Sequence, residues 1–121
     1  MTNKLAVYNG LIAPSSYVNA TKEERAAVVN GCGTGGWKGA LVPDSMWGLN
    51  VSGVCDIHDW MYEYGKTEED KDFADMLFMR NLIRLINAKG GWLAWLRRYR
   101  ATSYYNAVAE AGDEAFWRNK R

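Results

Sequence analysis

The only histidine of the chain, His58, lies in the segment CDIHDWMY at residues 55–62, and a glycine-rich run, GCGTGG, ends 22 residues before it. An imidazole beside a carboxylate suits proton transfer near neutral pH, because the unperturbed pKa of histidine lies in that range. Glycines let a backbone turn several carbonyl oxygens toward one point, so the run can surround a hard cation if a carboxylate completes the shell. The two segments therefore predict a glycine loop folded against the element that carries His58, with Asp59 as the carboxylate.

Helical spacing gives the segment around His58 two different faces. His58 and Tyr62 are four residues apart and share one face of a helix, whereas Asp59 is rotated from His58 by about 100°. One helix can thus present a base to one side and a metal ligand to the other.

A second helix is predicted to supply a partner for the histidine. Residues 75, 78, 79, 82 and 86 lie on one helical stripe, and all are apolar except Asp75. Desolvating a carboxylate without a partner costs several kcal/mol, and a hydrogen bond from an imidazole N–H is a common remedy. We therefore expect Asp75 to contact His58. The alternative is that Asp75 lies in the first turn of its helix and faces water.

Local signals predict helices separated by loops. The sequence TKEE at residues 21–24 is a capping box that opens a short helix ending near residue 30. Further helices are expected over residues 52–64, 67–88 and 92–117, the last either continuous or interrupted near residues 102–103 or 112. The stretch 32–53 is expected to be loop, with at most a short β ribbon within 36–51. The predicted fold class is all-α, a single domain over residues 1–121 in which two long packed helices carry the active site beside a glycine-rich loop.

These motifs resemble those of the secreted phospholipases A2, whose calcium loop reads Cys-Gly-x-Gly-Gly and whose active helix reads Cys-Cys-x-x-His-Asp-x-Cys-Tyr. Residues 32–36, CGTGG, match the loop. The helix positions that match in register are Cys55, His58, Asp59 and Tyr62. Val54 and Met61 stand where the family commonly has two further cysteines, and the stretch between loop and helix is several residues longer than in the animal enzymes.

The resemblance implies a reaction and the residues that perform it. The reaction is calcium-dependent hydrolysis of the sn-2 acyl ester of glycerophospholipids, giving lysophospholipid and fatty acid. His58 would be the general base, Asp75 would orient it, and the N–H of Gly33 would help to stabilise the oxyanion. The implied Ca²⁺ ligands are the carboxylate of Asp59 and the carbonyls of Gly31, Gly33 and Gly35. The implied supporting groups are Tyr62, one of Tyr104 and Tyr105 (which could instead be core residues), and a disulfide between Cys32 and Cys55.

The charge distribution points to a lipid surface as the partner. Residues 80–121 carry nine Lys or Arg against three Asp or Glu, whereas residues 1–79 carry six against eleven. Trp92 and Trp95 beside Arg97, Arg98 and Arg100 are typical of an interfacial helix, although aromatic residues at helical spacing also occur in cores. We expect contact with a phospholipid membrane or lipid aggregate, and the sequence indicates neither a nucleic-acid partner nor a particular protein partner.

The sequence leaves the location of the protein open. It contains no apolar run long enough for a signal-peptide core or a membrane span. Cytosolic thiols usually stay reduced. A disulfide would therefore imply either that a signal peptide has been removed or that the protein is delivered by a non-Sec machine or a virion. The remaining alternative is that the protein functions with reduced thiols.

Two other functions remain open. Cys32, Cys55 and His58 with either aspartate could bind zinc, although the glycine loop has no purpose in such a site. A non-catalytic lipid-binding or virion module could keep the same scaffold, and the presence of His58, Asp59 and Asp75 argues against that reading.

Overall fold

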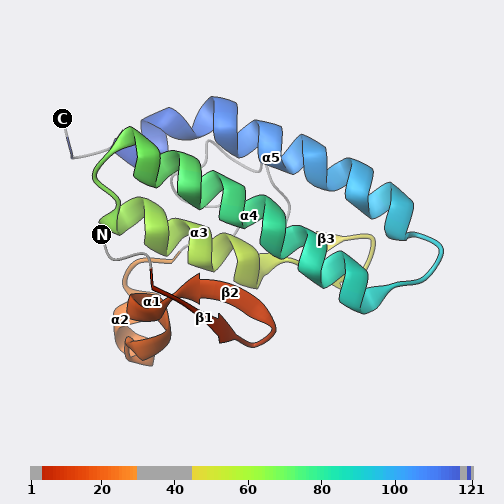
Figure 1. The fold of residues 1–121 in the computed structure, drawn as a ribbon, viewed down its shortest axis with the longest axis horizontal. Coiled ribbons are helices and arrows are strands. Elements are labelled where there is room, and N and C mark those ends of the chain that lie inside the picture. The colour runs from red at the N-terminus through yellow and green to blue at the C-terminus, as the bar shows by residue number, and fades with distance from the viewer. Residues whose placement is uncertain (1–3, 30–44, 118–119, 121) are drawn as a thin grey trace.

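The computed structural model describes residues 4–29, 45–117 and 120, and Figure 1 shows their arrangement. Three long helices, α3 (Ser52–Tyr64), α4 (Glu68–Lys89) and α5 (Ala94–Trp117), make up most of this part of the chain. Two short helices, α1 (Ser15–Asn19) and α2 (Lys22–Ala26), lie close to an antiparallel hairpin of β1 (Leu5–Tyr8) and β2 (Leu11–Pro14). A second hairpin, β3 (Ser45–Met46) with β4 (Leu49–Asn50), leads into α3.

The core lies where α4 packs against both α3 and α5. The largest fully buried apolar side chains are Phe78, Phe116, Met61, Leu77, Leu82 and Ile86. Burying a side chain of this size contributes roughly 1.5–3 kcal/mol relative to leaving it exposed, so these contacts are the main source of stability. Within the described residues, no helix combines the length and the apolar character needed to cross a membrane.

The ends of α3 and α4 follow from local signals, as predicted. The chain leaves α3 at Gly65, whose N–H donates to the carbonyl of Met61 at 2.9 Å. α4 begins with a capping box in which the Thr67 hydroxyl accepts from the N–H of Asp70 at 3.1 Å and the Asp70 carboxylate accepts from the N–H of Thr67 at 3.2 Å. It ends before Gly90, which has a φ of 62°, a conformation that glycine adopts without steric cost.

Helix α2 is shorter than predicted, whereas α5 is the continuous one of the two predicted alternatives. The capping box of Thr21 and Glu24 is present, but α2 ends at Ala26 instead of near residue 30. α5 is continuous through residues 102–103 and 112. The hydroxyl of Thr102 donates to the carbonyl of Arg98 one turn earlier, at 3.4 Å, so this residue is accommodated within the helix.

The predicted all-α fold built on two long helices is wrong, because the described chain has two small antiparallel hairpins and α5 packs against α4 as a third long helix. The helix itself was expected over residues 92–117, and the second hairpin lies within 36–51, where a short ribbon was expected. Each hairpin turns through two residues with positive φ: Asn9 at 50° with Gly10 at 82°, and Trp47 at 49° with Gly48 at 82°. Two successive positive φ angles match the right-handed twist of the flanking strands. An Asn-Gly pair between apolar segments is a strong sequence signal for such a turn, so the first hairpin could have been predicted.

A buried amide joins the first hairpin to the helical layer. Asn81 on α4 is 1% exposed; its Oδ1 accepts from the N–H of Ile12 at 2.8 Å and its Nδ2 donates to the carbonyl of Ile12 at 2.8 Å. The Nε of Arg84, one turn further along α4, donates to the carbonyl of Gly10 at 3.0 Å. One side chain thus satisfies both backbone groups of a β2 residue, which fixes the hairpin on α4.

Candidate active site

Helix α3 presents its two faces as the spacing predicted. His58 and Tyr62 are buried, and their rings lie 4.1 Å apart between centroids. Asp59 is half-buried, and its charge, like that of Asp56, raises the pKa of Tyr17 after the larger effect of burial. Asp59 follows His58 directly in α3, so its side chain leaves the helix on a different side from the buried imidazole.

Asp75 on α4 accepts hydrogen bonds from both buried residues of α3. Its Oδ1 lies 2.7 Å from Nε2 of His58 and 2.7 Å from the hydroxyl of Tyr62. Asp75 is only 2% exposed, so the alternative in which it faces water does not hold. The ring of Phe78, one turn further along α4, lies 5.0 Å from the His58 ring and covers it from that side.

The charge state of Asp75 decides where the shared proton lies. Burial raises the pKa of this carboxyl, but hydrogen bonds from His58, Lys71 and Tyr62, together with the charge of His58, lower it by more, so the pKa stays below its usual range. An ionised carboxylate can only accept, which places a hydrogen on Nε2 of His58. Nδ1 is then the nitrogen that carries the lone pair whenever the imidazole holds a single proton. Burial, followed by the charge of Asp75, raises the pKa of Tyr62 and keeps its hydroxyl protonated.

Lys71 is the one member of this cluster that the sequence interpretation missed. Its Nζ lies 2.8 Å from Oδ2 of Asp75 and 3.2 Å from the carbonyl of Ala109 on α5, to which it donates. The side chain is 3% exposed. Lys71 and Asp75 are four residues apart on one helix, a spacing that brings opposite charges together, so the pair was visible in the sequence.

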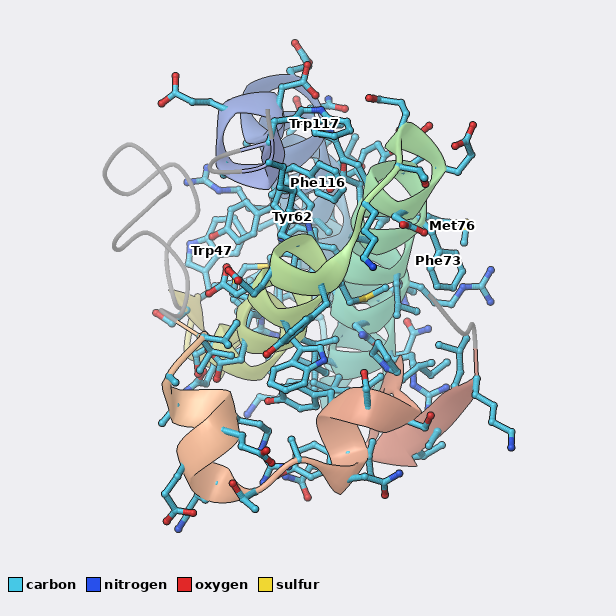
Figure 2. The ribbon with its side chains drawn as sticks, turned by 90° about the vertical axis from the view of Figure 1, so that its left-hand side faces the viewer. Trp47, Tyr62, Phe73, Met76, Phe116 and Trp117 are labelled. Carbon is cyan, nitrogen blue, oxygen red and sulfur yellow. The ribbon has the colours of Figure 1, made fainter. Side chains whose placement is uncertain are left out.

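Close packing of α5 holds Tyr62 in place. A Cβ added at Gly112 would lie 2.3 Å from the Tyr62 hydroxyl oxygen, so only glycine fits there without a shift. Figure 2 shows Tyr62 of α3 beside Phe116, which lies on α5 like Gly112, and the two rings meet edge to face with their centroids 5.1 Å apart. The Tyr62 hydroxyl is therefore held in place by its hydrogen bond to Asp75 of α4 and by packing against α5.

The other predicted site residues are placed less closely. Tyr104 is buried beside Arg100, whose guanidinium lies 5.9 Å from the Tyr104 ring, and Tyr105 is half-buried; within the described residues neither donates to Asp75. Cys55 is buried and disulfide-bonded. The residues that lie outside the described part are Gly31, Cys32, Gly33 and Gly35, so the loop ligands, the oxyanion donor and the partner of Cys55 stay predictions.

Searches of protein-family models, curated proteins and solved structures found no match for this chain. The functional argument therefore depends on the geometry of the cluster around Asp75 and on the motifs of the sequence.

Proposed function

We propose that this protein hydrolyses the sn-2 acyl ester of glycerophospholipids in a calcium-dependent reaction. The observation that carries the proposal is the buried pair of His58 and Asp75, joined at 2.7 Å through Nε2, with the carboxylate of Asp59 on another side of the same helix. An ionised carboxylate that orients an imidazole is the arrangement that general-base hydrolysis needs.

In the proposed reaction Nδ1 of His58 takes a proton from a water molecule whose oxygen attacks the ester carbonyl. Asp75 holds the imidazole in the correct tautomer and stabilises the imidazolium, which then returns the proton to the leaving alcohol oxygen. Tyr62 donates to the same carboxylate oxygen and limits its rotation. Asp59 supplies the hard oxygen that Ca²⁺ prefers, and the bound ion would polarise the ester carbonyl and neutralise the oxyanion.

A zinc site is the weaker alternative. Cys55 is disulfide-bonded and so cannot supply a thiolate, and Nε2 of His58 is already engaged by Asp75. The other alternative is a non-catalytic lipid-binding module. The experiment below would support this alternative if no product forms.

The deciding experiment measures fatty-acid release from mixed phospholipid vesicles with calcium and with EGTA. We expect release only with calcium, and a loss of at least about 100-fold in His58→Gln, since a positioned base typically contributes 10²–10⁴-fold. Asp59→Asn should also lose activity, whereas Asp56→Asn, which removes the other half-buried aspartate of α3, should keep it. Undiminished release of fatty acid in EGTA would contradict the role of calcium. Absence of release from the parent protein would contradict the proposed hydrolytic activity.

We also propose that the substrate surface is met by the first turns of α5. Trp92, in the turn before α5, and Trp95 and Tyr99, on the helix itself, are 78%, 64% and 74% exposed. Trp95 and Tyr99 are four residues apart and so share one face of the helix. Arg98 and Arg100 flank this face and are exposed. Residues 89–109 include three exposed basic residues and no acidic one, which suits an anionic bilayer, where tryptophan favours the interface.

Arg97 does not belong to this surface, contrary to the expectation from sequence. It is 4% exposed, and its guanidinium donates to the carbonyls of Met46, at 3.1 Å, and Trp47. The prediction failed because the acceptors lie about 50 residues earlier in the chain. Arg97 fastens the second hairpin to α5 and must be left intact in any test of lipid binding.

The test of this surface is the double variant Trp92→Ala/Trp95→Ala. We expect weaker binding to vesicles that contain anionic lipid and unchanged hydrolysis of a monomeric short-chain ester. Met76→Ala is the control, because Met76 is also an exposed apolar residue but lies on α4, outside the proposed surface. Parental vesicle binding by the double variant would exclude this face of α5.

A further inference from the structure

The carboxylate of Asp75 has two oxygens with different neighbours. Oδ1 accepts from His58 and Tyr62, which both lie on α3. Oδ2 accepts from the ammonium of Lys71 at 2.8 Å. A carboxylate can rotate about its terminal bond, and a rotation that moves Oδ1 away from His58 also breaks the contact of Oδ2 with Lys71. The ammonium therefore resists the motion that would release the imidazole.

We infer that Lys71 is a positioning residue of the active site: it holds the Asp75 carboxylate ionised and fixed in rotation, and acts on His58 only through that carboxylate. The inference rests on the proposed function for its catalytic meaning. The resemblance to phospholipases A2 left open whether Tyr104 or Tyr105 donates to Asp75 or belongs to the core; in the described residues the further donor to this carboxylate is the ammonium of Lys71.

Burial and charge make the role of Lys71 specific to this site. Lys71 and Asp75 are each 3% exposed in their side chains, so the two charges compensate each other where water does not. Removing one partner of such a pair leaves an uncompensated buried charge. The ammonium is itself held by the carbonyl of Ala109 on α5 at 3.2 Å, which fixes its direction. Asp113 is a minor neighbour, because it lies 3.9 Å away and its side chain is 68% exposed.

The test compares Lys71→Met, which keeps the length of the side chain but not the charge, with Lys71→Arg and Asp113→Asn. On a monomeric ester with calcium we expect Lys71→Met to lower kcat by about 10–100-fold, the usual effect of losing a group that orients a functional side chain, with KM changed less than about two-fold. Lys71→Arg should recover most of kcat, and Asp113→Asn should match the parent. If Lys71→Met does not fold, Lys71→Gln replaces it in the same comparison.

A double-mutant cycle separates positioning from general stability. If Lys71 acts only through Asp75, Lys71→Met should cause no further loss of kcat in an Asp75→Asn background. Full additivity of the two losses, or a parental kcat in Lys71→Met, would overturn the inference.

A second measurement does not require hydrolysis, so failure of the proposed function can be told apart from failure of this inference. His58 is the only histidine, so ¹⁵N-histidine labelling gives one pair of ring signals. We expect the parent at fixed neutral pH to hold the hydrogen on Nε2, and Lys71→Met to lose this single form while Asp113→Asn keeps it. An unchanged Nε2–H signal in Lys71→Met would refute the positioning role even in a protein without activity.

Discussion

The contact between Gly112 and Tyr62 gives a prediction whose sign depends on the active-site hydrogen bond. In an exposed helix, glycine to alanine stabilises by about 1 kcal/mol. At Gly112 the new Cβ would lie 2.3 Å from the Tyr62 hydroxyl and 3.2 and 3.3 Å from two ring carbons. The hydroxyl cannot withdraw easily, because it donates to Asp75 at 2.7 Å.

The expected result of Gly112→Ala is a net destabilisation. Overpacking in a filled core costs typically 1–3 kcal/mol, and a contact this short belongs at the upper end of that range. Subtracting the gain in helix propensity leaves a loss of about 2 kcal/mol in the free energy of unfolding. The measurement is urea unfolding followed by circular dichroism, with Ala111→Gly as the control that reports helix propensity in the same turn.

The decisive comparison repeats Gly112→Ala in a Tyr62→Phe background. Without the hydroxyl only the two longer ring contacts remain, so the substitution should become neutral or stabilising by up to about 1 kcal/mol. The coupling between the two positions should therefore be about 2–3 kcal/mol, within the range found for residues in contact. An equal cost of Gly112→Ala in both backgrounds, or no cost in either, would refute the reasoning.

Two further predictions concern Asn81 and acid stability. Asn81→Leu should destabilise the protein by about 2–6 kcal/mol, because it leaves the N–H and the carbonyl of Ile12 without their partner at about 1–3 kcal/mol each. Arg84→Met should cost less than about 1 kcal/mol in the same urea titration. The folded pKa of Asp75 is lowered, so this residue's contribution to stability is present above its unfolded pKa of about 3.9 and is lost as the pH falls from there through the folded pKa. The free energy of unfolding, measured from pH 6 to pH 2, should therefore fall less steeply with acid in Asp75→Asn than in the parent. Parallel curves for the two proteins would contradict this.

Local signals carried the parts of the fold that the sequence could predict. Helix α3 ends before Gly65 and α4 begins after Thr67, because each of these residues satisfies backbone groups within a few residues of itself. The need of a buried Asp75 for a partner could also be inferred, since periodicity alone puts this carboxylate on an apolar stripe. The first hairpin was not predicted although Asn9 and Gly10 carry its turn signal, because the apolar–polar alternation typical of a strand is weak on both sides of that pair.

Contacts between distant segments could not be predicted in this way. Nothing near Arg97 in sequence distinguishes it from Arg98, and only the approach of the second hairpin buries one and leaves the other exposed. Asn81 likewise resembles an ordinary polar residue on a helix until β2 lies against it. Lys71 falls between these cases: its spacing to Asp75 was readable, but its burial depends on α5.

The cluster around Asp75 also sets an order in which the site can be assembled. α3 and α4 are joined by only three residues, 65–67, so the bonds of Asp75 to His58 and Tyr62 need little chain closure. The carbonyl that holds Lys71, and the glycine that admits Tyr62, both belong to α5. During synthesis α5 leaves the ribosome after α3 and α4, and until it docks, water reaches the carboxylate and competes for its donors. α5, which is made after α3 and α4, is thus the helix that closes the site, so a nascent chain exposes its histidine and aspartate to water until that helix has been completed.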